Sequence, residues 1–224
     1  MQNRVIGQVF AATVLVVAAW SRAAPPAVTL DFNDLPFMQQ PHEPPYFGFA
    51  PPPETLVSDR YRSVGVVFGR PGLSAGMAGF RTLEDGRHTL VALDANGLLP
   101  GHPNNGGAYD GNSYFRFVVP GTDTPALAEN VSFVVGDAGG DLDHYEIRGY
   151  GLDDALAYVH GVASPSYVTV TMPFAVQRVE VDFQDDFGYS LDDLSFTIVP
   201  EPAAVALLGG ALATSLLRRP GRSA

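Results

Sequence analysis

The sequence contains no cysteine and no lysine, so all 13 of its basic residues are arginines. Without cysteine the chain forms no disulfide bond, no thiolate metal site and no cysteine nucleophile. Charged residues of all kinds make up only 17% of the chain. Any polar chemistry therefore depends on carboxylates, hydroxyls, amides, arginines and five histidines.

The few charges are unevenly distributed. All 24 acidic residues lie between Asp31 and Glu201, together with 8 of the 13 arginines, which gives this region a formal charge of 8 − 24 = −16. Such a surface repels a phosphate backbone, so we expect no nucleic-acid partner. It suits divalent cations, an extracellular setting or simple solubility.

Long helical patterns are absent from the middle of the chain, and the 24 glycines and 19 prolines of the whole sequence, most of which lie there, favour turns. Short segments there alternate apolar with polar residues, which is typical of strands that bury one face. We predict strands at residues 28–33, 64–69, 88–93, 113–119, 130–136, 144–149, 156–161, 167–172, 176–183 and 191–199. Residues 25–198 are therefore expected to form an all-β domain, an antiparallel, jelly-roll-like β-sandwich.

Residues 36–56 are rich in proline and differ from the rest of this domain. Proline cannot donate a ladder hydrogen bond, so we expect a long surface loop that stays out of the sheet interiors. The loop is either a spacer over the sheet or a ligand contact.

The N-terminus has the layout of a secretory signal peptide. Arg4 precedes an apolar stretch over residues 5–20, and the small residues Ser21 and Ala23 follow. We predict a signal helix at 1–24, cleaved after Ala23 or Ala24; an uncleaved anchor is the alternative.

The C-terminus holds a second apolar segment, residues 203–217, followed directly by Arg218 and Arg219. As a single hydrophobic helix of 15 residues, it is about 22 Å long against a hydrocarbon core of about 30 Å. The positive-inside rule keeps the two arginines in the cytoplasm. A temporary stop in the inner membrane is expected, with the acidic domain already exported; a tail anchor is the alternative.

The tetrad Val199, Pro200, Glu201 and Pro202, the segment 203–217 and the arginine cluster at 218–222 occur in that order. Together, residues 199–222 resemble the PEP-CTERM sorting signal of Gram-negative bacteria. The resemblance implies recognition and cleavage by a membrane protease, an exosortase, after export by signal peptidase and the secretion machinery. It places the protein at the cell surface or in the exopolysaccharide matrix.

Acidic residues gather at the ends of the first and last predicted strands. Asp31 and Asn33 share one face of the first strand, and Asp192 shares a face with the apolar residues Leu194 and Phe196 of the last. An inward carboxylate needs a partner, and first and last strands are commonly neighbours in a jelly roll. Asp31, Asn33 and Asp192 are therefore candidate ligands for a structural Ca²⁺, which binds oxygen atoms. Turn formation by Asp and Asn is the alternative.

The stretch 187–196 resembles the closing strand of galactose-binding-like and carbohydrate-binding jelly rolls. The resemblance implies a calcium ligand at Asp192, completed by Asp31 and Asn33. A further Gly/Asp loop at 137–143 does not match an EF-hand, and we interpret it as a turn.

Catalytic signatures are missing. No His pair has zinc-ligand spacing, and neither a nucleophile elbow nor a P-loop is present. We therefore expect no enzyme, but a surface or matrix protein that binds glycan through a calcium-stabilised sandwich. Tyr46, Phe47, Tyr109 and Tyr114 are candidate aromatic sugar platforms or core residues. The alternatives are a purely structural matrix protein and a secreted enzyme acting on glycosides.

Overall fold

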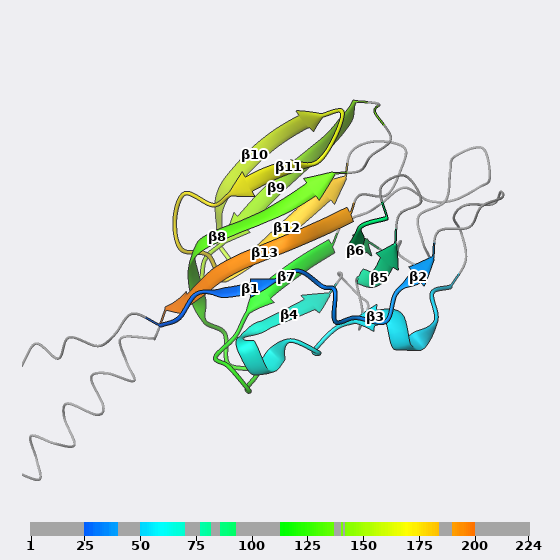
Figure 1. Cartoon of the computed structure of the whole chain (residues 1–224). Helices are drawn as coiled ribbons and strands as arrows, with labels where there is room; N and C mark the ends of the chain where they lie inside the picture. Colours follow the sequence, from blue (N-terminus) through cyan, green and yellow to red (C-terminus); the bar gives the residue numbers. More distant parts are fainter. Residues whose placement is uncertain are drawn as a thin grey trace, which may run out of the picture.

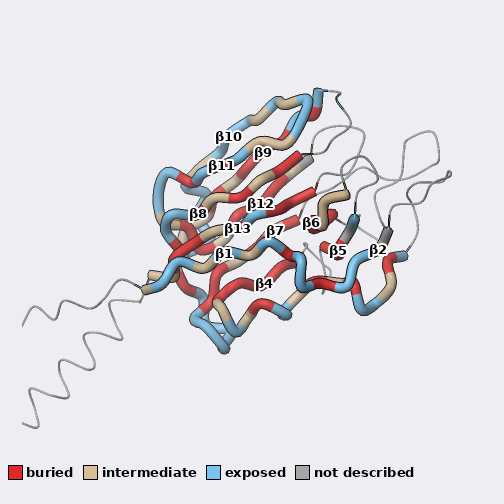
Figure 2. Tube along the Cα trace, viewed as in Figure 1, coloured by how far each residue is buried: buried red, intermediate tan, exposed pale blue. Residues whose placement is uncertain are grey.

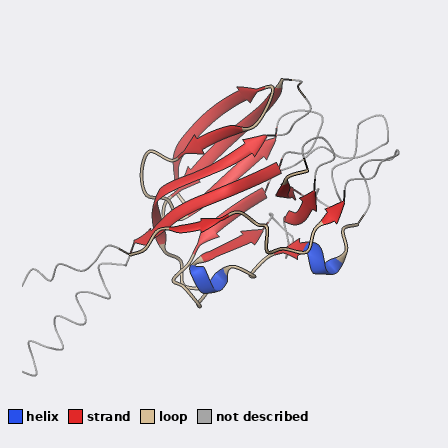
Figure 3. Ribbon diagram, viewed as in Figure 1, coloured by secondary structure: helices blue, strands red, loops and turns tan. Residues whose placement is uncertain are grey.

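The computed structural model describes residues 25–39, 50–69, 77–81, 86–92, 113–136, 140, 142–183 and 190–199. Within these residues the chain forms two β-sheets that face one another, with two short 3₁₀ turns as the helical elements (Figures 1 and 3). The predicted antiparallel β-sandwich is confirmed. The predicted signal helix (1–24) and C-terminal helix (203–217) lie outside the described residues.

The larger sheet has eight strands in the order β11-β8-β13-β6-β5-β2, with β1 paired to β13 and β3 paired to β5. Its strands are β1 (Val28–Leu30), β2 (Met38–Gln39), β3 (Leu56–Val57), β5 (Met77–Arg81), β6 (His88–Ala92), β8 (Leu127–Gly136), β11 (Val168–Thr171) and β13 (Ser190–Val199). All pairings in this sheet are antiparallel except that of β2 with β5.

The smaller sheet has five antiparallel strands in the order β10-β9-β12-β7-β4. They are β4 (Val66–Gly69), β7 (Ser113–Phe117), β9 (Asp143–Tyr150), β10 (Leu156–Ser164) and β12 (Arg178–Phe183). From β7 onward the chain changes sheet at almost every connection, which is the jelly-roll-like feature of the fold.

The core lies between the sheets, where the buried faces of their strands meet (Figure 2). Phe115 of β7 is fully buried and its ring contacts Phe68, Phe117 and Phe133 at centroid distances of 6.1, 5.8 and 5.3 Å. Burial alternates along β7 and β9, and the register carries the alternation to β12, so these three strands present their even-numbered residues on the outer face of the sheet. This alternation creates a polar outer face above an aromatic core.

All ten predicted strand regions contain strands, whereas β2, β3 and β5 were not anticipated. β5 lacks β-branched residues and has Gly79 at its centre, where a Cβ atom would overlap the carbonyl oxygen of Pro36. β2 and β3 are the two ends of the proline-rich segment 36–56, and both pair with the same edge of β5. Edge positions tolerate nearby proline, and the described residues of the segment stay out of the sheet interior but contribute to two edge strands; residues 40–49 of the predicted loop lie outside the described residues.

Candidate functional site

The first and last described strands are neighbours, as the sequence predicted: β1 pairs with β13, and Leu30 lies opposite Leu194. Asp31 is fully exposed, and its Oδ1 accepts a hydrogen bond of 3.2 Å from the backbone nitrogen of Asn33. Hydrogen bonds from Asn33 hold the pKa of Asp31 below its usual value. Asn33 is also exposed. Turn formation, the alternative to calcium binding, is thus present at these two residues.

Asp192, in contrast, is only 6% exposed. Its Oδ1 accepts a 2.8 Å hydrogen bond from the Asp193 backbone, and its Oδ2 lies 3.2 Å from Nη2 of Arg87. Burial raises the pKa of Asp192 to about 6. The carboxylates of Asp193 and Asp31 also raise this pKa, whereas the Asp193 backbone hydrogen bond and the charge of Arg87 lower it. The partner that an inward carboxylate requires is therefore an arginine, which the sequence analysis did not identify.

The donor atoms of the predicted calcium set are oxygens, as Ca²⁺ prefers. In this structure, however, the positive charge next to the Asp192 carboxylate is that of the Arg87 guanidinium. Within the described ranges, no cluster of three or more His, Asp or Glu side chains is placed to hold a metal. Calcium binding by Asp31, Asn33 and Asp192 stays a prediction.

Of the predicted sorting motif, Val199 is the last residue of β13 and lies opposite Leu127. Pro200, Glu201, Pro202, Arg218 and Arg219 lie outside the described residues. No helix among the described residues has the length and apolar character needed to cross a membrane.

The outer face of the smaller sheet carries a continuous group of tyrosines, arginines and carboxylates. We call it the Tyr–Arg face and define it by eight residues on β7, β9 and β12: Tyr114, Arg116, Glu146, Arg148, Tyr150, Arg178, Glu180 and Asp182. The register sets them in rows, because Glu180 lies opposite both Arg148 and Tyr114, and Arg178 lies opposite both Tyr150 and Arg116.

Glu180 is the centre of this face and is 7% exposed. Its Oε2 accepts hydrogen bonds from the Tyr150 hydroxyl (2.9 Å) and from Nη1 of Arg178 (3.0 Å), while its Oε1 lies 3.5 Å from Nη1 of Arg148. Burial and the bond to Glu180 raise the pKa of Tyr150, so its hydroxyl remains a donor at neutral pH. One carboxylate thus fixes three side chains from two strands.

Arg178 lies between two aromatic rings. Its guanidinium carbon is 3.8 Å from the ring centre of Tyr150 and 5.8 Å from that of Tyr114. Nη2 donates a 2.7 Å hydrogen bond to Asp154. Stacking and ion pairing together hold the guanidinium in one orientation.

Tyr114 lies against the backbone of β4 because residue 69 is glycine. A Cβ atom at Gly69 would come within 2.6 Å of Cζ and Oη of Tyr114. Beside this ring is a hollow of about 290 Å³, lined by Asp59, Arg62 and Val67 as well as Tyr114 and Arg116. The Tyr–Arg face therefore continues into a shallow depression at the β4 edge.

The chemistry of this face suits binding rather than bond cleavage. It offers fixed donors and acceptors beside aromatic rings, on an open surface that an extended ligand can lie along. Its carboxylates are engaged by arginines: Arg148 lies 2.9 Å from Asp182, and Arg178 lies 3.0 Å from Glu180.

The sequence pointed to only part of this site. Tyr114 was among the four candidate aromatic residues and lies on the face; Tyr46, Phe47 and Tyr109 lie outside the described residues. Tyr150 and Arg178 were missed. The signal for Arg178 was the polar alternation along residues 176–183, which predicted a strand, whereas Tyr150 lies one residue beyond the predicted strand 144–149.

No protein-family model matches this chain, and no curated protein matches it. Among solved structures, a xylan-binding domain from CBM 22 is 13% identical, with a TM-score of 0.36, over 66% of this chain and 97% of that domain. The CBM22-1 and GH10 modules of a Clostridium thermocellum endo-1,4-beta-D-xylanase, complexed with xylohexaose, give 8% identity and a TM-score of 0.35 over 66% of this chain. The enzymatically active domain of the bacteriophage CBA120 tailspike protein 4 is 11% identical, with a TM-score of 0.25, over 60% of this chain. The aligned regions make up 28% of the xylanase chain and 18% of the tailspike chain.

Proposed function

We propose that this chain is an exported, non-catalytic polysaccharide-binding protein and that the Tyr–Arg face binds the sugar chain. The observation that carries the proposal is the Arg178 guanidinium held between the rings of Tyr150 and Tyr114, over a Glu180 carboxylate that fixes it. Sugars present both apolar C–H faces and hydroxyl groups. A surface that sets aromatic rings beside oriented donors matches both.

The charge of the face narrows the class of polysaccharide. Three arginines (Arg116, Arg148, Arg178) are balanced by three carboxylates (Glu146, Glu180, Asp182), which leaves a formal charge of zero. The surrounding region is strongly acidic, and acidic polymers are repelled by it. A neutral polysaccharide is therefore the expected ligand.

The open shape of the face favours binding along a chain rather than at a chain end. The hollow beside Tyr114 extends the face toward β4, so several sugar units can lie across β9, β12, β7 and β4. Because the donors are already fixed by ion pairs, little side-chain entropy is lost on binding.

Export is the second part of the proposal and rests on the two ends of the sequence. A signal peptide at 1–24 and a PEP-CTERM-like tail at 199–222 suit secretion, transient retention in the inner membrane and release by an exosortase. The working domain then acts at the cell surface or in the exopolysaccharide matrix of a Gram-negative bacterium.

The binding test is retention of the protein by neutral polysaccharides in affinity gel electrophoresis, followed by calorimetry on the polymer that binds. We expect Tyr150→Ala and Tyr114→Ala each to weaken binding about tenfold, since a tyrosine ring covered by a sugar loses apolar contact worth about 1–2 kcal/mol when it is removed.

The matched control is Phe37→Ala, which removes a ring that is 39% exposed but lies on the segment between β1 and β2. It should bind like the wild type. Equal binding by all three variants would reject the Tyr–Arg face as the site. Absence of binding to any neutral polysaccharide would instead favour a purely structural matrix protein.

A further inference from the structure

One side of the sandwich differs from the rest in its charge. Residues 155–177, 23 in succession, contain no Asp, Glu or Arg in a chain that also lacks lysine. They form β10, β11 and the connections around them, and both strands are the outermost of their sheets (Figure 1). This uncharged side stands out because the region from Asp31 to Glu201 otherwise carries a formal charge of −16.

β10 is also a long and exposed edge strand. It has nine residues, and among the described residues it pairs with β9 alone. Leu156 and Val159 are 54% and 51% exposed. Natural proteins usually protect such edges with charges, proline or a covering segment, because unpaired backbone groups attract another strand.

The opposite edge of the same sheet shows this protection. β4 has only four residues, and the chain before it covers its outer side. The nitrogens of Phe68 and Val66 donate hydrogen bonds to the carbonyl oxygens of Ser58 (2.8 Å) and Tyr61 (3.3 Å). The contrast between the two edges marks β10 as the edge available for pairing.

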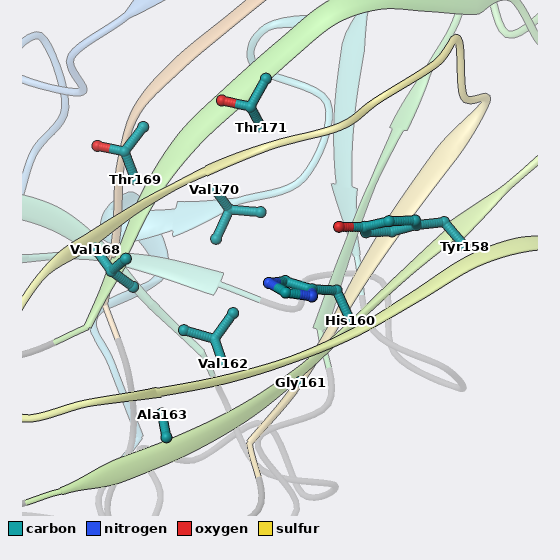
Figure 4. A pocket seen from close by; sticks show the side chains of 9 residues that line it. All are labelled: Tyr158, His160, Gly161, Val162, Ala163, Val168, Thr169, Val170 and Thr171. Carbon is teal, nitrogen blue, oxygen red and sulfur yellow. The ribbon is translucent and has the colours of Figure 1, made fainter.

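The space between β10 and β11 is open as well. A hollow of about 320 Å³ lies there, lined mainly by valines, threonines, Tyr158 and His160. The side chains of Tyr158 and His160 project from β10 toward β11 (Figure 4). At this side of the molecule the two sheets are not closed over one another, and uncharged side chains, both polar and apolar, line the gap.

We propose that β10 pairs antiparallel with β10 of a second copy of this chain, joining two five-stranded sheets into one of ten strands. A two-fold axis perpendicular to the sheet makes the pairing self-complementary, since each strand offers the same unpaired groups to the other. The partner's inward side chains then cover the hollow between β10 and β11.

Electrostatics favours this edge for a contact between two acidic copies. The nearest charged residues on the strands of the five-stranded sheet are Asp143, Glu146 and Arg148, all of which lie on β9. Across the pairing, the two β9 strands are separated by three strand spacings, about 14 Å. This exceeds the screening length of about 8 Å at physiological salt. Two acidic molecules therefore approach with little repulsion between these sheets along β10.

The arrangement also has a consequence for binding. With the axis perpendicular to the sheet, both Tyr–Arg faces lie on the same side of the ten-stranded sheet. A polysaccharide chain long enough to reach both would be held at two sites. This consequence rests on the proposed function, whereas the pairing itself does not.

The test is sedimentation equilibrium of the full chain in mild detergent at several salt concentrations. The wild type should be dimeric, and raising the salt should strengthen the dimer because it screens the net negative charge. His160→Glu places an inward-pointing charge on the exposed edge and should give a monomer. The control His144→Glu makes the same change on β9, at an exposed position away from the edge, and should remain dimeric.

The absence of cysteine permits a second, independent readout. Single cysteines placed in turn along Leu156–Ser164 should form an oxidised cross-link only near the two-fold axis, where Cα atoms are less than about 7 Å apart. The same substitution at Val119, between β7 and β8, should not cross-link.

Three results would overturn the proposal: a wild type that stays monomeric up to its solubility limit, a dimer that survives His160→Glu, or no cross-link along β10. A monomer whose β10 amides are protected from hydrogen exchange would show that the chain's own segments cover the edge. That outcome also overturns it. Loss of dimerisation with retained sugar binding would leave the proposed function standing.

Discussion

At the scale of single residues, two buried carboxylates differ in the partners that surround them. Glu180 accepts hydrogen bonds from Tyr150 and Arg178 and lies beside Arg148, and its environment organises the Tyr–Arg face. Asp192 is equally buried, but burial outweighs the charge of Arg87, and its pKa rises to about 6. The first carboxylate orients three donor side chains of the Tyr–Arg face, whereas burial disfavours the ionised form of the second.

The raised pKa of Asp192 predicts a pH dependence of stability. In the unfolded chain an aspartate has a pKa of about 3.9, so between pH 4 and 6 the folded state holds more protons than the unfolded state. The free energy of unfolding should therefore fall as pH rises through this window, by about 2–3 kcal/mol from this group. Above about pH 7 no further loss from it is expected.

The substitution Asp192→Asn keeps the shape of the side chain and removes its titratable carboxyl group. In EDTA, the variant should lack the pH-dependent loss that the wild type shows between pH 4 and 6. The measurement is urea unfolding at a series of pH values, and Asp123→Asn, in an exposed turn, is the control. Parallel pH profiles for wild type and Asp192→Asn would contradict the assignment.

Calcium binding by Asp31, Asn33 and Asp192 gives a separate prediction. A bound cation stabilises the folded state, so the melting temperature of the metal-stripped protein should rise with added calcium. Asp192→Asn should abolish this rise, because it removes an anionic oxygen ligand. If calcium and EDTA leave the melting temperature of the wild type unchanged, the residues serve the turn and the Arg87 ion pair alone.

At the scale of strands and turns, alternation in sequence was the effective signal. The segments with β-branched and aromatic residues at every second position became β7, β9, β12 and β13 with nearly the predicted bounds. β5 could not be found this way, because its place depends on a glycine that lets the chain at Pro36 approach it. β2 and β3 have two residues each and exist only as partners of β5.

The position of Tyr114 depends on the strand beside it. Gly69→Ala would force the ring away from β4, since the new methyl group would overlap Cζ and Oη. The side chain can swing into solvent, so stability should change by less than about 1 kcal/mol. Polysaccharide binding, in contrast, should weaken.

A double-mutant cycle separates this effect from a general disturbance of β4. In a Tyr114→Ala background, Gly69→Ala should cause no additional loss of binding, because the ring it displaces is gone. Calorimetry on the four proteins measures the coupling. Additive losses would mean that Gly69 acts independently of Tyr114.

At the scale of the whole molecule, charge and topology act together. The acidic surface, the balanced Tyr–Arg face and the uncharged β10–β11 side belong to different parts of one sandwich. Each part therefore has its own expected partner: solvent, a neutral polysaccharide and a second copy of the chain. Only the first of these assignments is visible from composition.

The two ends predict how the chain is processed. In a host that has an exosortase, mass spectrometry of the exported protein should give an N-terminus after Ala23 or Ala24 and a C-terminus without residues 203–224. A C-terminal epitope tag should be lost. Replacing Glu201 by alanine should retain the tag, because it breaks the sorting motif. A tag that persists on the exported wild type would reject exosortase sorting.

The sequence by itself determined the sandwich, most of its strands and the acidic surface. These properties follow from local alternation, turn residues and composition, which act over a few neighbouring positions. The tertiary structure decided which side chains meet: Arg87 with Asp192, Arg178 between Tyr114 and Tyr150, and β10 as an edge. These contacts join residues far apart in the chain, and strand order, which no local pattern encodes, brings them together.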